Sequence, residues 1–292
     1  MERKLKIISA DERMAQDKGV KALIVGPAGV GKTTLLRTLN PKTTLFIDLE
    51  AGDLAVQDVK VDTFQPRTWE ECRDLAVYLG GPNPALPPTA VFSQAHYDAV
   101  VQSMGGPDAL NKYETYFIDS ITVAGRLCFQ WCEQQPESFN DRGKKNMLGT
   151  YGLMGREMIA WLTHLQHTRG RNVIFVGILE NLKDEFNVTS WALQIEGGKT
   201  GKELPGIVDQ IVTMQFVSFG EGLPVRALVC TAPNQWAYPA KDRSGRLEQI
   251  EEPHLGKWLA KLTGKGPRHA VDHTIPPQQT EKPAETKTAQ VA

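Results

Sequence analysis

Short apolar runs alternate with amphipathic stretches along most of the chain. The runs predict buried strands over residues 21–26, 43–50, 61–64, 115–121 and 172–178. Near-continuous apolar runs of this kind are typical of parallel sheets, whose two faces are both covered by helices. The amphipathic stretches predict helices over 34–39, 68–79, 121–134 and about 151–168. This alternation predicts an α/β fold, with a mostly parallel central sheet and helices on both faces.

The C-terminal part has a different pattern. From residue 211 the sequence reads strand, glycine turn and strand (IVTMQFVSF, EG, LPVRALVC), followed by a helix near 253–262. This pattern predicts antiparallel strands added at the C-terminal edge of the sheet. Residues 80–112 begin GGPNPALPP and predict a surface insertion with one short helix. Residues 265–292 are rich in Pro, Thr, Gln and charge, so we expect one domain over 1–264 and a disordered tail.

Composition narrows the function classes. The 292 residues are 41% hydrophobic and carry a formal net charge of −1, so no global positive field is available to hold nucleic acid or an anionic membrane. Four cysteines form no C-x-x-C pair, and the N-terminus lacks the apolar stretch that export requires. No apolar run approaches the roughly 18 to 20 residues that cross a bilayer. We therefore expect a cytoplasmic protein without a membrane association.

The most specific motif follows the first predicted strand and precedes the first predicted helix. It fits G-x-x-x-x-G-K-[ST] at every fixed position, in the context that a phosphate-binding P-loop requires. Its glycines let backbone N–H groups turn inward around the phosphates of ATP, its lysine reaches the β/γ oxygens, and its threonine hydroxyl ligates Mg²⁺. The predicted nucleotide-binding residues are Gly26, Pro27, Ala28, Gly29, Val30, Gly31, Lys32, Thr33 and Thr34.

A second metal-site residue is predicted at the end of another strand. Asp119 ends the apolar run Tyr116-Phe117-Ile118, where P-loop NTPases place the carboxylate that holds a Mg²⁺-bound water. An acidic strand end or a helix cap is the alternative interpretation of this residue.

Two further segments carry a family resemblance. TLFIDLEAGDLAV followed by VDTFQPRTWEECRDL resembles the second strand, acidic end, third strand and Gln-Pro-helix of the RecA-like ATPases. The resemblance implies a RecA-like P-loop NTPase fold, with Glu50 as the catalytic carboxylate that polarises the attacking water and Asp48 in support. FIDSI, GKTGKELPG and AKDRSGRL resemble more narrowly the phage ATPases associated with single-strand annealing and recombination.

That resemblance also predicts loops that meet DNA, after the third and fourth core strands. The first loop carries Arg142, Lys144 and Lys145, and the second carries Lys199 and Lys202. Phosphate contacts summed over an oligomer would provide affinity for single-stranded DNA despite a neutral monomer. Solvated loop charges are an equally good interpretation. Trp191, expected in the second loop, is a candidate for stacking on a base.

A basic pair near the C-terminus resembles another known segment. Lys241-Asp242-Arg243-Ser244-Gly245 is similar to the K-x-R-N-G segment of DnaB-type replicative helicases, which contacts the γ-phosphate across a subunit interface. Alternate residues of an extended segment point the same way, so Lys241 and Arg243 could converge on one phosphate. The resemblance implies catalytic roles for both residues at a neighbouring subunit's nucleotide. A charged hairpin tip is the alternative.

These observations favour a Mg·ATP-dependent ATPase acting in phage-type recombination or repair, as a homo-oligomeric ring or filament on single-stranded DNA. A single-strand-binding or replication protein is a further expected partner, and a phage or prophage origin is implied by the resemblance. The alternatives are a nucleotide-switched interaction or loader protein with slow hydrolysis, and a small-molecule kinase. The kinase is disfavoured because no Arg-rich lid segment follows the core strands.

Overall fold

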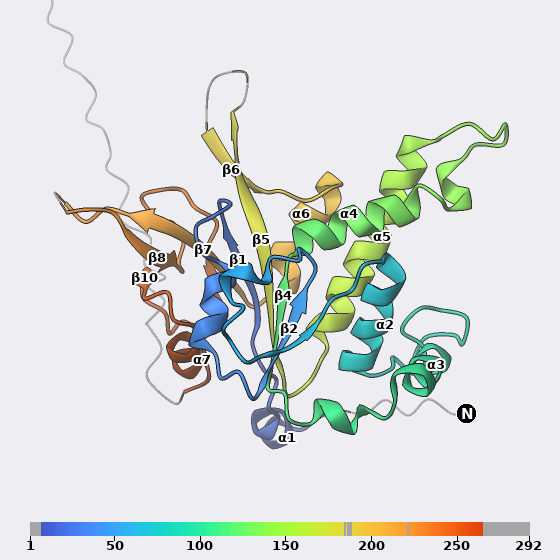
Figure 1. Ribbon diagram of the computed structural model, residues 1–292, viewed down its shortest axis with the longest axis horizontal. Coiled ribbons are helices and arrows are strands. Elements are labelled where there is room, and N and C mark those ends of the chain that lie inside the picture. The colour runs from blue at the N-terminus through green and yellow to red at the C-terminus, as the bar shows by residue number, and fades with distance from the viewer. Residues whose placement is uncertain (1–6, 184, 186–188, 221, 265–292) are drawn as a thin grey trace, which may run out of the picture.

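A central sheet dominates the computed structural model, which describes residues 7–183, 185, 189–220 and 222–264 (Figure 1). The strand order is β10-β8-β7-β1-β5-β4-β2-β3, with β6 paired to β5 and β9 paired to β7. The strands are β1 (Lys21–Gly26), β2 (Thr44–Asp48), β3 (Asp62–Phe64), β4 (Thr115–Asp119), β5 (Asn172–Lys183), β6 (Thr189–Leu193), β7 (Gln210–Val217), β8 (Val225–Val229), β9 (Lys241–Asp242) and β10 (Ile250–Glu251).

Parallel pairing connects β3, β2, β4, β5, β1 and β7, while β6, β8, β9 and β10 pair antiparallel to their neighbours. β1, β2 and β4 are buried along their whole length, as continuous apolar runs require when both faces of a sheet are covered. The predicted α/β fold, with a mostly parallel sheet and antiparallel strands at the C-terminal edge, is confirmed.

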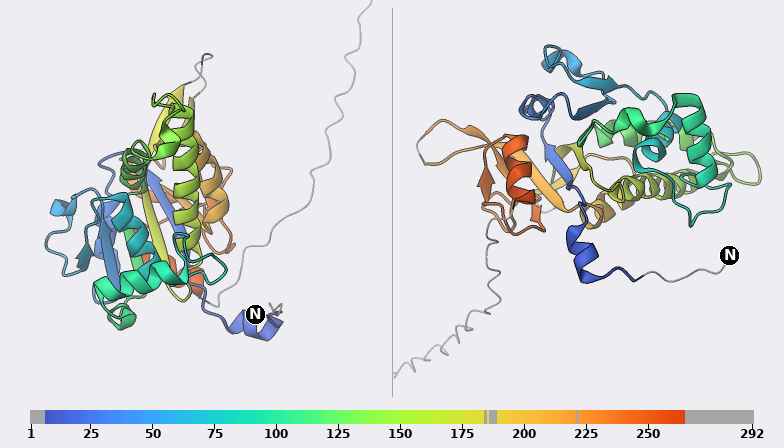
Figure 2. Two further views of the ribbon diagram at one scale, coloured as in Figure 1. Left: turned by 90° about the vertical axis from the view of Figure 1, so that its right-hand side faces the viewer. Right: turned by 90° about the horizontal axis from the view of Figure 1, so that it is seen from below.

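Helices cover both faces of the sheet (Figure 2). Successive residues of β1 point to opposite faces: Leu23 and Val25 pack with α2, α4 and α5, whereas Ala22 and Ile24 pack with η1 and α7. The α-helices are α1 (Ala10–Ala15), α2 (Trp69–Gly80), α3 (Gln94–Met104), α4 (Ile121–Cys132), α5 (Met147–Gln166), α6 (Gly198–Ile207) and α7 (Leu255–Thr263). The 3₁₀ helices are η1 (Thr33–Thr38), η2 (Asp53–Ala55), η3 (Pro107–Leu110) and η4 (Pro136–Ser138).

The start of α2 shows how local sequence places the elements. Thr68 and Glu71 form a capping box, in which each side chain accepts a hydrogen bond from the other residue's backbone N–H. The segment 80–112 contains α3, which packs on α2, and the short η3. Within it, Phe92 is buried and stacks on the His164 ring with centroids 4.3 Å apart. The expected surface insertion is therefore joined to the body of the domain by α3 and Phe92.

The structure differs from the sequence-based expectation at the end of β5, in the second polar loop and in the type of helix after the P-loop. The strand expected over 172–178 continues to Lys183 and turns back as β6, because backbone pairing continues through exposed polar residues that resemble a loop. The second polar loop therefore contains a hairpin and α6. The helix after the P-loop is the short 3₁₀ helix η1, which ends before Asn40-Pro41. The tail predicted over 265–292 lies outside the described residues. No described helix is long and apolar enough to span a membrane.

Close approach of the backbone constrains the strand that leads to the P-loop. Gly19 precedes β1 with φ +60°, and a Cβ atom there would lie 2.0 Å from the carbonyl oxygen of Arg171. Gly170 has a similar φ of +64°, but a Cβ there would meet nothing within 4 Å. The two glycines thus differ in the space around them rather than in backbone conformation.

We expect Gly19→Ala to lower the free energy of unfolding by about 2 kcal/mol or more, because a fixed backbone oxygen must move. Gly170→Ala should cost about 1 kcal/mol, the strain of a left-handed alanine alone. Chemical denaturation of the two variants and the parent measures the difference. Equal losses for both variants would contradict the close approach at Gly19.

Candidate nucleotide and metal site

The P-loop leaves the carboxyl end of β1 and turns through two glycines with positive φ. Gly29 has φ +76° and Gly31 has φ +101°, and a Cβ at Gly29 would enter space free of other atoms within 4 Å. Such a turn directs successive backbone N–H groups into one concavity that can hold an anion. Because η1 has only 6 residues, these N–H groups supply most of the attraction, and a helix dipole adds little.

Lys32 lies folded along the loop. Its buried ammonium donates hydrogen bonds to the carbonyl oxygens of Gly26 and Pro27, each at 2.9 Å. Burial lowers the pKa of Lys32, and the nearby charges of Asp119 and Glu50 oppose that shift. An ammonium has three N–H donors, so with two on the loop a third can reach a phosphate oxygen. The loop thus presents a positive charge at its centre.

Thr33 and Asp119 meet beside Lys32. The Thr33 hydroxyl donates to Asp119 Oδ2 at 2.6 Å, across the gap between the start of η1 and the end of β4. Burial raises the pKa of Asp119 to about 6, and the hydrogen bond from Thr33 acts in the opposite direction. Hydroxyl and carboxylate oxygens are the ligands that Mg²⁺ takes together with water and phosphate. This pair therefore fits a metal ion bound with a nucleotide.

Glu50 follows β2 and reaches the same site. The Ser120 hydroxyl donates to Glu50 Oε1, and the charge of Glu50 acts on the pKa of both Asp119 and Lys32. The sequence interpretation did not single out Ser120, although a hydroxyl residue directly after the strand-ending aspartate was a usable signal.

Asp48 holds the segment that carries Glu50. Asp48 Oδ1 accepts the backbone N–H of Glu50 at 3.2 Å and of Gly52 at 3.3 Å. Its other oxygen accepts from Gln65 Nε2 at 3.0 Å. The buried carboxylate thus ties together the turn after β2 and the Gln-Pro segment after β3. Asp48 is a positioning residue for Glu50.

The basic residues expected at DNA lie on two different elements. Arg142, Lys144 and Lys145 lie in the turn between α4 and α5, where Lys145 is 2.7 Å from Glu133. Lys199 and Lys202 lie on α6, so the expectation of a loop there is wrong. Trp191 lies in β6, half-buried, with its ring 5.1 Å from that of Tyr238. The expectation of a loop at Trp191 is wrong for the same reason.

Lys241 and Arg243 do lie side by side. Lys241 Nζ donates to the carbonyl oxygens of Pro205 and Val208, and Arg243 donates to Gly206 O and pairs with Asp209 at 3.1 Å. β9 pairs with Gln210–Ile211, which are in register with Ala22–Leu23. The basic pair therefore lies toward the opposite end of the strands from its own P-loop.

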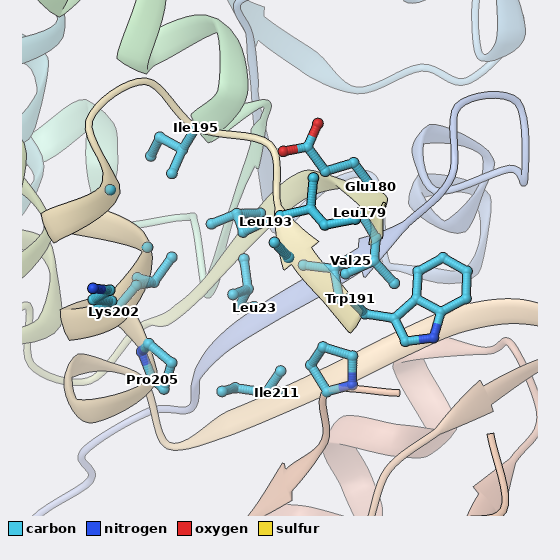
Figure 3. A pocket seen from close by; sticks show the side chains of 16 residues that line it. Leu23, Val25, Leu179, Glu180, Trp191, Leu193, Ile195, Lys202, Pro205 and Ile211 are labelled. Carbon is cyan, nitrogen blue, oxygen red and sulfur yellow. The ribbon is translucent and has the colours of Figure 1, made fainter. Parts of the chain in front are cut away.

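A separate apolar pocket of about 500 Å³ lies between the sheet, β6 and α6 (Figure 3). Leu23, Val25, Trp191 and Leu193 line it, with Glu180 and Lys202 as charged members. Leu23 and Val25 point away from η1, so the pocket lies on the opposite face of the sheet from the P-loop helix. Glu180 and Asn181 belong to the β5–β6 hairpin, where they pair with Ala192 and Trp191.

Comparison with known families agrees with this geometry. A family described as "AAA domain" matches residues 18–244. The chain belongs to this AAA domain family. It is accordingly a P-loop ATPase domain, and ATP with Mg²⁺ is the cofactor pair of that class.

No curated protein matches the chain. Among the solved structures that match, one has 15% identity and a TM-score of 0.36, and the alignment covers 68% of this chain and 51% of the other. It is described as "Structural and biochemical analysis of a prototypical ATPase from the type III secretion system of pathogenic bacteria". The AAA domain chain thus aligns with about half the length of that protein.

We expect Glu50→Gln to preserve nucleotide binding and to lower ATP turnover by about 100-fold, the scale seen when a positioned base is lost. Asp53→Asn, on the same surface segment, is the matched control and should leave turnover unchanged. Ser120→Ala, which frees Glu50 Oε1, should give a smaller loss than Glu50→Gln. Steady-state phosphate release and equilibrium nucleotide binding separate the two effects. Near-normal turnover of Glu50→Gln would transfer the catalytic role to another acid, with Glu180 the first to test.

Proposed function

We propose that the chain is a Mg·ATP-hydrolysing, RecA-like ATPase that works as a homo-oligomer on single-stranded DNA, in phage-type recombination or repair. The observation that carries the proposal is the meeting of Lys32, Thr33, Asp119 and Glu50 at one edge of the sheet. The first three are the groups that hold a nucleotide with its metal, and the fourth is a carboxylate suited to water activation.

Each residue of the site has a distinct role in the proposed hydrolysis. Lys32 binds phosphate oxygens with the N–H that its two carbonyl contacts leave available. Because Ser120 occupies Glu50 Oε1, the remaining oxygen, Oε2, can orient a water molecule and accept its proton. The contacts from Asp48 to the backbone of residues 50 and 52 limit the positions that this carboxylate can take. Bound Mg²⁺ supplies the positive charge that stabilises the phosphate oxygens during transfer.

The single-stranded DNA assignment rests on the basic turn after α4 and on the resemblance to annealing and recombination ATPases. Arg142 and Lys144 are exposed, and their backbone N–H groups donate to the Asn140 side chain, which shapes the turn. Lys202 is likewise exposed, on α6. Contacts repeated over an oligomer would sum to a useful affinity with a strong salt dependence.

ATP turnover with and without single-stranded DNA tests this role. We expect DNA to stimulate the wild-type protein and Lys32→Ala to abolish turnover in both conditions. Replacing Arg142, Lys144 and Lys145 together by Gln should weaken DNA binding and reduce its salt dependence. Each phosphate contact releases about one counterion from the DNA, so fewer contacts release fewer counterions.

The charge-matched control replaces Lys42, Lys60 and Lys257 by Gln. Lys42 and Lys60 precede the N-terminal ends of β2 and β3, the strand ends opposite to the P-loop, and Lys257 lies on α7. Turnover without any DNA effect would favour the nucleotide-switched interaction protein instead. Transfer of phosphate to a metabolite would favour a kinase.

An oligomer could also complete the active site. We propose that Lys241 and Arg243 act on the nucleotide of a neighbouring subunit. Their side chains point the same way, toward the C-terminal end of α6, and away from their own P-loop end of the sheet. An arginine provided in trans stabilises transition-state charge and contributes about 10³-fold or more to turnover.

Mixing two nearly inactive variants, Arg243→Ala and Lys32→Ala, tests this arrangement. We expect activity to return, because one boundary in the mixed oligomer combines an intact P-loop with an intact Arg243. A mixture of Lys32→Ala with Glu50→Gln is the control, since both lesions lie in the same subunit's half of the site. A protein that stays monomeric with ATP, together with an inactive mixture, would refute the trans role.

A further inference from the structure

An arginine from a distant part of the same chain lies against the P-loop. Gly31 directly precedes Lys32, and a Cβ atom at Gly31 would lie 3.1 Å from both Cζ and Nη1 of Arg226 and 3.4 Å from its Nε. All three atoms belong to the guanidinium group. Arg226 thus places its charged end on the phosphate-binding loop, although the two residues lie far apart in the sequence.

The hairpin of β7 and β8 puts Arg226 in this place. β7 runs parallel to β1, and Thr213 lies in register with Val25, next to the start of the P-loop. β7 then continues past that edge of the sheet and pairs with β8, so that Phe216 lies opposite Arg226. The hairpin therefore rises beside the P-loop, and the β8 side chain at this register contacts Gly31.

The contacts of Arg226 differ from those of the arginines that form ion pairs. Arg37, Arg73 and Arg243 each pair with a carboxylate. Within the described part of the chain, Arg226 has no hydrogen-bond or ion-pair partner, and its Cζ lies 5.3 Å from the centroid of the Phe216 ring. The aromatic face supports the guanidinium and leaves its N–H donors available. An exposed guanidinium that lies against the P-loop with its N–H groups available is suited to binding an anion.

We propose that Arg226 binds the polyphosphate of the nucleotide held by its own P-loop, with Phe216 as the residue that positions it. The planar guanidinium matches phosphate oxygens in pairs, which a lysine cannot do. The inference rests on the proposed nucleotide-binding function. It adds a charge from the same subunit to those of Lys32 and of the basic pair proposed to act across the subunit boundary.

The arrangement has a contrary interpretation that experiment can separate. If the guanidinium occupied the space that the phosphates need, Arg226 would compete with the nucleotide, and its removal would tighten binding. If Arg226 instead contacted the base or ribose, its removal would leave the binding of a bare polyphosphate unchanged.

The test measures dissociation constants of Mg·ADP and Mg·ATP for the full chain, and displacement of ADP by inorganic tripolyphosphate. We expect Arg226→Gln to weaken the binding of all three ligands by about 10- to 100-fold, the effect of losing hydrogen bonds to a charged group. The affinities of Arg226→Lys should lie between those of Arg226→Gln and those of the parent. Phe216→Leu should weaken binding by about threefold, since it removes a cation–π contact at an exposed site.

Two controls accompany these variants. Lys257→Gln removes a positive charge on α7, and Val225→Thr changes the exposed neighbour of Arg226 on β8. Both should bind as the parent does, and thermal unfolding should show every variant folded.

Unchanged affinity of Arg226→Gln, tighter binding, or unchanged tripolyphosphate displacement would each overturn the inference while leaving the P-loop assignment intact. A wild-type chain that binds none of the three ligands would overturn both the inference and the proposed function.

Discussion

The parallel register of β1, β5, β4 and β2 is the constraint on which the site depends. Parallel strands end at the same edge, so the loop after Gly26, the carboxylate of Asp119 and the turn after Asp48 all emerge together. Asp48 and Asp119 are direct neighbours across β2 and β4. A shift of one residue in this pairing would turn one of the two carboxylates to the other face of the sheet. Backbone pairing thus determines which side chains meet at the site.

Within that frame, the carboxylates serve different purposes because their surroundings differ. Asp48 is buried and saturated by backbone and amide donors, so it organises the turn and is not available to a ligand. Asp119 is equally buried but has a hydroxyl as its neighbour, and its raised pKa of about 6 reflects the cost of keeping a charge away from water. Glu50 is exposed and has one oxygen occupied by Ser120, as suits a group that must meet water.

The parts of this arrangement that were predictable are those with local signals. The P-loop has fixed residues at fixed spacing, and β1, β2 and β4 are continuous apolar runs, so both could be placed from the sequence. The continuation of β5 through residues 180–183 could not, because this mostly polar and mostly exposed stretch of a projecting hairpin resembles a loop. α6 contains Gly201 and Pro205, which argue against a helix on propensity alone. The contact between Arg226 and Gly31 has no local signal, since it arises from the pairing of β7 beside β1.

The unbroken course of β5 has a mechanical consequence. The strand lies between β1 and β4, and its residue Ile178 is in register with Gly26, where the P-loop begins. From Ile178 to Lys183 it extends roughly 17 Å further as one arm of the β5–β6 hairpin, at the usual rise of a strand. Since a single strand joins the two regions without an intervening loop, a load on the arm is transmitted to the strand that borders the P-loop. A displacement of the β5–β6 hairpin would therefore act on the strand next to the P-loop without passing through a loop.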